Sequence, residues 1–368
     1  MILAKPTMAT IAAAVWLLHA PIANAQQAFS DTRIQTSVQR TIIEYIRPAF
    51  TDFQDQATRT RDRISNLCNA PDQLALNQVR HEFAELVPAW SKIEILRFGP
   101  LVKDNRFERL HFWPDRRGRA LKQVQAALAA NDPSVTNAQS LSGKSVAVQG
   151  LGALEYLLYG TGSEALTTKN IEGQHRCIFA RAVASNVTNI GRELRTDWAD
   201  EDGFSAALIR FGPNNARFRN AREVAVQMFG TVVDGLDWVK DAKLKPVIGD
   251  TAEKAKPKRA SFWRSEQTTR AIAANLDGLR TYLLAADLLA MLPESERYYA
   301  QSVAFEFANA NRALSQIEKA PLEAFTNEAD RGKLTYTIIV VDSLRDIMAG
   351  VVGPALGVQS GFSVLDGD

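Results

Sequence analysis

The sequence predicts an all-α protein made of helical bundles, and three observations lead to this prediction. Apolar residues recur at three- and four-residue spacing along most of the chain after Gln26, which is the period of an amphipathic helix. Alternating strand patterns bounded by hairpin turns are hard to find. Short turns rich in Pro, Gly and Asn separate the helical stretches, as they do in bundles. With 368 residues, 46% of them hydrophobic, the chain can bury one large core or two of ordinary size.

Each helix is predicted from its apolar face. The face of the first helix is built by Val38, Ile42, Ile43, Ile46, Phe50 and Phe53. The stretch 74–98 repeats the pattern through Val79, Phe83, Leu86, Val87, Trp90, Ile93 and Leu96. Further helices fit residues 117–130, 145–159, 172–198, 217–242, 265–291, 294–318 and 330–350. The run 335–341 has the most strand-like composition, and we predict a helix there because helix-compatible sequence flanks it.

Two polar stretches and a short repeat indicate how the chain is divided. Residues 199–216 interrupt the helical pattern, so we expect one bundle in residues 26–200 and a second in residues 201–368. Residues 249–261 are rich in Lys, which is typical of a solvated loop. Pro100 lies upstream of Phe112-Trp113 and an Arg/Ala helix, and Pro246 lies upstream of Phe262-Trp263 and another such helix, which favours two similar bundles.

The first 25 residues have the features of a signal peptide. Lys5 precedes an apolar run at 11–18, and Ala23-Asn24-Ala25 fits a small-x-small cleavage site. The run is too short for an ordinary transmembrane helix. We therefore expect an exported, soluble periplasmic protein with no transmembrane segment after cleavage.

The two cysteines, Cys68 and Cys177, predict a disulfide. In an oxidising compartment an isolated pair is most simply bridged, and two cysteines allow one connectivity. The bridge would close a loop of about 110 residues, worth on the order of 4 kcal/mol in the chain-entropy model. Two buried free thiols are the alternative.

Charge and motifs exclude several function classes. A formal net charge of +2 gives no general reason to bind nucleic acid or an anionic membrane. The zincin pattern H-E-x-x-H fails because Glu85 stands four residues after His81. P-loop, dinucleotide-binding and nucleophile-elbow patterns fail as well. His111 and His175 are the other histidines after cleavage, which limits any His-rich metal site.

The most informative segment is residues 149–160, QGLGALEYLLYG. Gly150 and Gly152 lie in a helical pattern where Gly costs roughly 1 kcal/mol relative to Ala, so they indicate close approach of another backbone or a ligand. Glu155 on the buried side of this helix needs a cation, hydrogen-bond donors or a metal. A Glu–Arg bridge between packed helices is the simplest of these solutions.

This segment resembles the imelysin family, whose signature is G-x-H-x-x-E within a stretch of the form GFHAIEYLLWG. Gly150 matches the Gly and Glu155 the Glu, but Gly152 stands in place of the His. Three other regions are similar to the family. They are residues 90–100 with Glu94 and Arg97 in a Glu-x-x-Arg-Phe-Gly turn, Phe112-Trp113-Pro114-Asp115, and the tail from Leu356-Gly357-Val358 to Gly361-Phe362 and Asp366-Gly367-Asp368.

The resemblance implies two similar helical bundles with a site in the groove between them. It also implies an exported or envelope protein, with links to iron acquisition in some members and metallopeptidase activity in the founding member. We expect the groove to be lined by Glu94, Arg97, Trp113, Asp115, Gly150, Gly152 and Glu155.

Gly152 decides between the functions that the resemblance offers. Without the imidazole, a catalytic zinc is hard to assemble, whereas a divalent metal or iron could still bind oxygen ligands such as Glu155 and Glu94, with Asp115. Arg97 could instead neutralise Glu155 or bind an anionic ligand. Our leading hypothesis is a periplasmic binding protein for a small ligand or metal ion, connected with metal uptake and envelope uptake proteins. The alternative is an envelope metallopeptidase.

Overall fold

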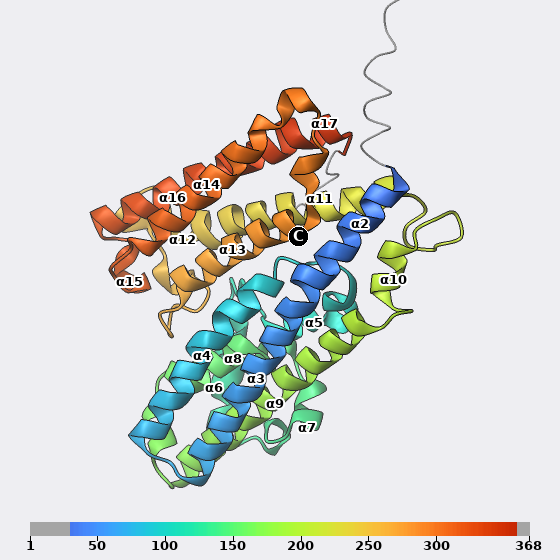
Figure 1. The fold of residues 1–368 in the computed structure, drawn as a ribbon. Helices are drawn as coiled ribbons and strands as arrows, with labels where there is room; N and C mark the ends of the chain where they lie inside the picture. Colours follow the sequence, from blue (N-terminus) through green and yellow to red (C-terminus); the bar gives the residue numbers. More distant parts are fainter. Residues whose placement is uncertain (1–29, 359–368) are drawn as a thin grey trace, which may run out of the picture.

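Every regular element of residues 30–358, the part that the computed structural model describes, is a helix, and Figure 1 shows two groups of them. The first bundle contains α3 (Arg47–Asn69), α4 (Gln73–Ile93), α5 (Arg106–Leu110), α6 (Arg119–Ala129), α7 (Ala138–Ser142), α8 (Leu151–Tyr159) and α9 (Ile171–Ala199). The second contains α11 (Ala221–Asp237), α12 (Lys245–Ile248), α13 (Thr268–Ala286), α14 (Tyr298–Ser315), α15 (Pro321–Ala324), α16 (Glu328–Ile347) and α17 (Gly353–Leu356). The all-α prediction is confirmed.

The N-terminal helix runs along both bundles. α2 (Asp31–Thr41) continues through a π-helical turn, Ile42–Ile46, into α3. α3 packs against α4 and α9 of the first bundle, while α2 packs against α11 and α13 of the second and against α10 (Phe204–Ile209). The division at residue 200 stays a prediction, since residues 31–41 contact helices on the far side of it.

Local sequence signals explain where five of the helices begin. In each case the side chain of the residue before the helix accepts a hydrogen bond from the backbone N–H three positions later, which satisfies an otherwise unpaired donor. These caps are Ser30, Asp72, Asn170, Asn220 and Asn327. The expected apolar face of the first helix is buried except for Ile43, which is 62% exposed because it lies in the π-helical turn beside buried Ile42.

Helix bounds differ from the predicted ones mainly around the bundle interface. The predicted helix 74–98 ends at Ile93 and the predicted helix 265–291 begins only at Thr268. The predicted helix 217–242 continues through a π-helical turn, Trp238–Leu244, into α12. The run 335–341 is helical, as predicted, within α16. The short helices α5, α7 and α10 have too few residues to show a period in the sequence.

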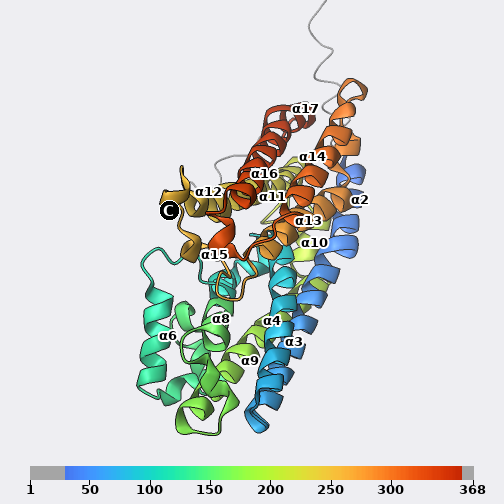
Figure 2. The same ribbon diagram turned by 90° about the vertical axis from the view of Figure 1, so that its left-hand side faces the viewer.

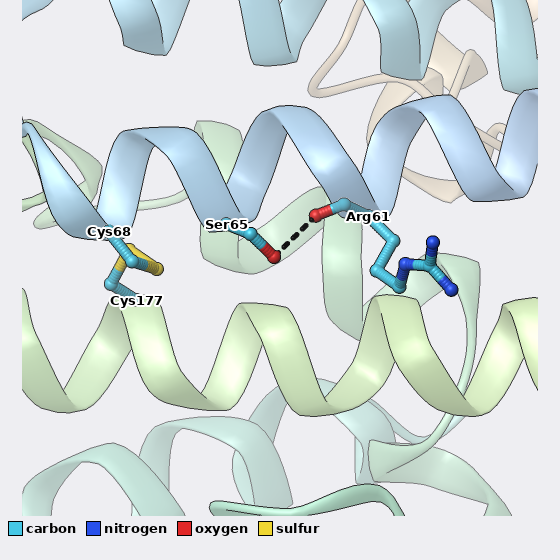
Figure 3. Close-up of a disulfide and its surroundings, with 4 residues drawn as sticks. All are labelled: Arg61, Ser65, Cys68 and Cys177. Carbon is cyan, nitrogen blue, oxygen red and sulfur yellow. Dashed lines mark hydrogen bonds between the residues drawn. A yellow bond between two sulfur atoms is a disulfide. The ribbon is translucent and has the colours of Figure 1, made fainter.

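Cys68 and Cys177 form the predicted disulfide (Figure 3). It joins the last turn of α3 to the first turns of α9, with the two Cα atoms 5.6 Å apart. Nearby, the Ser65 hydroxyl donates to the Arg61 carbonyl within α3. The bridge therefore fixes the outer end of a helix pair whose packing extends along the first bundle.

Two sequence expectations fall on other parts of the chain. The signal peptide, residues 1–25, and the tail carboxylates Asp366 and Asp368 lie outside the described residues. Leu356 ends α17, and the Val358 N–H closes a turn onto the Gly353 carbonyl at 2.8 Å. Among residues 30–358, no helix has the length and apolar character needed to cross a membrane.

Candidate functional site

The candidate site lies where the two bundles meet. α4 of the first bundle packs against α13 of the second, so the chain that follows α4 faces the second bundle. Glu94 and Arg97 belong to this following segment, and Gly150, Gly152 and Glu155 belong to the start of α8. The π-helical turn Trp238–Leu244 and the segment 261–267 complete the site from the second bundle. Helical π-turns occur frequently at functional sites.

Glu94 is held by hydrogen bonds that cross between the bundles. Its side chain is fully buried. Its Oε1 accepts from the Lys243 ammonium and from Asn275 Nδ2, the latter at 2.8 Å. Lys243 also donates to Asn275 Oδ1 at 2.7 Å, which closes a three-residue network. The carboxylate expected to bind a metal is thus an ion-pair partner of a lysine.

The environment of Lys243 is unusual for a lysine. Only 2% of its side chain is exposed, and burial lowers its pKa while the Glu94 carboxylate acts in the opposite direction. Lys243 follows Leu236 and Val239 at helical spacing, so it lies on the buried face of its helix. A buried ammonium needs a partner of opposite charge, and Glu94 is that partner.

Glu155 is satisfied by the second bundle as well. Its Oε1 accepts from the Ser265 backbone N–H at 2.9 Å and from the Ser265 hydroxyl at 2.8 Å. The pKa of Glu155 is raised because burial disfavours the charged form. The Ser265 hydrogen bonds and the nearby Arg264 charge act in the opposite direction without cancelling this effect. Arg264 itself stacks over the Trp263 ring, with its Cζ 4.3 Å from the centroid.

The segment 261–267 that holds Glu155 has a strained backbone. Phe262 and Glu266 have φ values of 58° and 61°, in the left-handed region that bulky residues seldom adopt. The Phe262 ring stacks on His111 at 4.5 Å between centroids. Burial, reinforced by the Lys243 charge, lowers the pKa of His111 to about 3, so its imidazole is neutral at physiological pH.

Aromatic rings from both bundles surround Arg97. Its Cζ lies 4.5 Å from the Phe107 centroid and 4.3 Å from that of Trp238, which are cation–π distances. The Arg97 guanidinium therefore stacks on rings, and the charge of Arg264 acts on Glu155. Successive rings contact one another in a closed chain at 5.6–6.2 Å: Trp90, Phe107, Trp238, Trp113 and His111.

Trp113 and Asp115 have structural contacts at the edge of the site. The Trp113 indole N–H donates to the Arg259 carbonyl at 3.2 Å, which joins the segment before α6 to the segment before α13. Asp115 accepts from the backbone N–H groups of Arg119 and Ala120, both at 2.8 Å, at the start of α6. Negative charge stabilises that end of a helix.

The two motif glycines differ in their surroundings. A Cβ on Gly150 would lie 2.2 Å from the Leu110 carbonyl oxygen, so this position requires glycine because the backbone of α5 approaches it. A Cβ on Gly152 would meet nothing within 4 Å. The expected close approach is therefore found at Gly150, whereas Gly152 has open space beside it.

Two basic loops meet beside the site, and we call them the basic loop pair. The first is residues 113–122, whose last four residues are the first turn of α6, and the second is residues 254–264; Figure 2 shows the two segments side by side between the body of α6 and α12. Their exposed cations are Arg116, Arg117, Arg119, Lys122, Lys254, Lys256, Lys258 and Arg259. Lys254 pairs with Asp250, and none of the others forms a salt bridge within the described chain.

The residues present do not fit a metal ion. Glu94 and Glu155 are each bound to donors, and Asp115 caps a helix. In residues 30–358 no three side chains of His, Cys, Asp or Glu are grouped as a metal would require. At the failed zincin pattern, Glu85 pairs with Arg270 at 3.0 Å and His81 is exposed.

Lys243, Asn275 and Ser265 belong to the site although they are not among the residues predicted from the sequence. Lys243 had a signal, because it continues an apolar helical face at Leu236 and Val239. Asn275 and Ser265 had none, since each acquires its role through a partner more than 100 residues away.

Comparison with known proteins supports the same fold. The family model described as imelysin matches residues 46–348. An imelysin-like protein from Psychrobacter arcticum superposes with a TM-score of 0.75 at 19% identity, covering 90% of this chain and 98% of that one. A candidate iron-regulated protein A precursor from Parabacteroides distasonis gives 0.72 at 12% identity, covering 89% and 96%. No curated protein matches the sequence.

Proposed function

Since this chain belongs to the imelysin family, we propose that it is an exported binding protein whose interbundle site takes an anionic ligand. The observation that carries the proposal is the basic loop pair. Its cations are exposed and almost all lack a salt-bridge partner among the described residues, although the whole chain has a net charge of only +2. A local excess of unpaired positive charge attracts anions and speeds their association.

The interior of the site offers donors that suit the same ligand class. The indole N–H groups of Trp90 and Trp238 are buried and have no hydrogen-bond partner among the described residues. Unpaired buried donors are rare in native proteins and call for a physical explanation. An anionic ligand supplies acceptor atoms for such donors, and the surrounding rings provide apolar contact for its carbon skeleton.

Iron fits this site as an anionic chelate rather than as a bare ion. A structural relative is described as a candidate iron-regulated protein, which favours an iron-related role. Two of the oxygens that a bare ion would need, Glu94 Oε1 and Glu155 Oε1, are engaged by Lys243, Asn275 and Ser265. A complex of ferric iron with an organic polycarboxylate brings its own ligands and a negative charge.

The peptidase alternative has weaker support in the geometry. A catalytic zinc needs three protein ligands and an open position, and Gly152 stands where the family has its histidine. We therefore assign no hydrolytic step to the site. The peptidase alternative would be favoured if the purified protein cleaves unfolded substrates, and if a chelator and the substitution Glu155→Gln each abolish that cleavage.

Charge reversal in the basic loop pair tests the proposal. The variant Arg116→Glu/Arg117→Glu/Lys258→Glu is compared with Arg192→Glu/Arg222→Glu/Arg312→Glu, which makes the same change of net charge at exposed positions outside the pair. Calorimetric titration with ferric citrate should show binding weakened about tenfold or more in the first variant, with a flatter salt dependence, and wild-type binding in the second. Equal losses in both variants, or no binding by wild type, would contradict the proposal.

A further inference from the structure

The contacts of Lys243 define a cation position inside the protein. Its ammonium lies between Glu94 Oε1 and Asn275 Oδ1. Asn275 Nδ2 donates to the Ser91 carbonyl at 2.6 Å and to Glu94 Oε1 at 2.8 Å, so the opposite face of the amide, Oδ1, is directed at Lys243. The second carboxylate oxygen, Glu94 Oε2, has no hydrogen-bond partner among the described residues. Carboxylate and amide oxygens are the donors that hard divalent cations prefer.

We propose that the Lys243 ammonium occupies the cation position beside Glu94, so that a side chain of this protein takes the place of a metal ion at this predicted ligand. The ammonium reaches this position from the second bundle, whereas Glu94 belongs to the end of α4 in the first. The same ion pair therefore neutralises the buried carboxylate and joins the bundles. This inference does not depend on the proposed anionic ligand.

Electrostatics explain why lysine and metal exclude each other here. Lys243 and Glu94 are both almost completely buried, so a divalent ion placed beside them would add a like charge to the ammonium in a poorly screened interior. Displacing the ammonium would instead leave it buried without its partner, which is costly. His111, the neighbouring ring, is neutral because burial lowers its pKa to about 3.

Substitution of Lys243 provides the test, with Mn²⁺ and Zn²⁺ as probes. Lys243→Ala removes the ammonium and opens space beside the two oxygens, whereas Lys243→Met removes the charge but fills the volume. We expect both variants to melt at lower temperature than wild type. Metal should raise the Tm of Lys243→Ala by several degrees and leave Lys243→Met, wild type and the control Glu94→Gln/Lys243→Ala unchanged.

Calorimetric titration of wild type gives a decision that does not depend on variant folding. We expect wild type to show no binding of Mn²⁺ or Zn²⁺ that depends on Glu94, so wild type and Glu94→Gln should give the same titration curves. Stoichiometric binding by wild type that disappears in Glu94→Gln would overturn the proposal. So would a Lys243→Ala protein that gains neither stability nor bound metal, including one that stays unfolded when metal is present.

Discussion

At the scale of single residues, the site is organised by buried polar groups that find partners in the opposite bundle. Glu94 and Glu155 both come from the first bundle and both bind donors of the second. Burying a carboxylate without such partners would cost several kcal/mol. The bundles can therefore pack in this arrangement only because these two carboxylates form hydrogen bonds across the interface.

Ser265→Ala should lower the free energy of unfolding by about 1–3 kcal/mol. The substitution removes the 2.8 Å hydroxyl bond to Glu155 and leaves only the backbone N–H as donor from Ser265. Ser261→Ala is the matched control, because the Ser261 hydroxyl is buried with no hydrogen-bond partner among the described residues and its loss should be neutral or stabilising. Urea denaturation measures both. Equal effects of the two substitutions would show that the Glu155–Ser265 hydroxyl bond does not contribute to the free energy of unfolding.

The two motif glycines should respond in opposite directions to alanine. Gly150→Ala should destabilise by about 1–3 kcal/mol, because the new Cβ would overlap the Leu110 carbonyl. Gly152→Ala should stabilise by about 0.5–1 kcal/mol, because its Cβ meets open space within α8 and alanine reduces the entropy of the unfolded chain. Thermal melts of both variants measure the shifts. A destabilised Gly152→Ala would mean that the position is crowded.

The sequence is informative about single residues only where their chemistry is local. Glycine at 150 and the buried position of Glu155 can be predicted from neighbouring residues. The partner of Glu155 cannot, because Ser265 is an ordinary residue of a polar-looking segment until the bundles pack. For Arg97 the sequence suggests a partner in Glu155 or in an anionic ligand, whereas its stacking on the rings of Phe107 and Trp238 depends on other elements.

At the scale of elements, the apolar period and the capping residues predict the long helices, whereas tertiary contacts change the bounds of some of them. Helix 171–199 matches its predicted span within a residue at each end, because Asn170 caps it and its apolar face is long. The predicted helix 265–291 loses its first turn because residues 261–267 are drawn into contact with Glu155 and His111. Contacts between distant segments have no counterpart in local periodicity.

The disulfide is the strongest single constraint between elements. Cys68→Ser/Cys177→Ser should lower the free energy of unfolding by about 4 kcal/mol, because the bridge closes a loop with a sequence separation of 109 in the unfolded chain. Guanidinium denaturation of the variant measures the loss. Reductant should destabilise wild type similarly and leave the double variant unchanged. An unaltered midpoint after full reduction of wild type would contradict this expectation.

At the scale of the whole molecule, acid should weaken the fold through His111. Its pKa is about 3 in the folded protein against 6.5 for an ordinary histidine, so between these values the unfolded chain binds a proton that the native chain does not. The free energy of unfolding therefore falls as pH drops below about 6.5, by about 2–3 kcal/mol between pH 7 and pH 4.5. The raised pKa of Glu155 acts in the opposite direction and is common to wild type and variant.

His111→Phe isolates this contribution, because a phenyl ring keeps the stacking on Phe262 but does not titrate. Urea denaturation at the two pH values should show a smaller acid-induced loss in the variant than in wild type. An identical loss in both proteins would mean that His111 is protonated in the native state or exposed to solvent.

Anomalous X-ray diffraction from crystals grown with ferric citrate tests most directly whether this family member binds an anionic ligand at a site closed to bare metal. We predict an iron peak beside the cations of the basic loop pair, outside bonding distance of the Glu94 and Glu155 carboxylates, with Lys243 still paired to Glu94. An iron peak bonded to either carboxylate, or no peak anywhere near the interbundle site at saturating ferric citrate, would contradict the account.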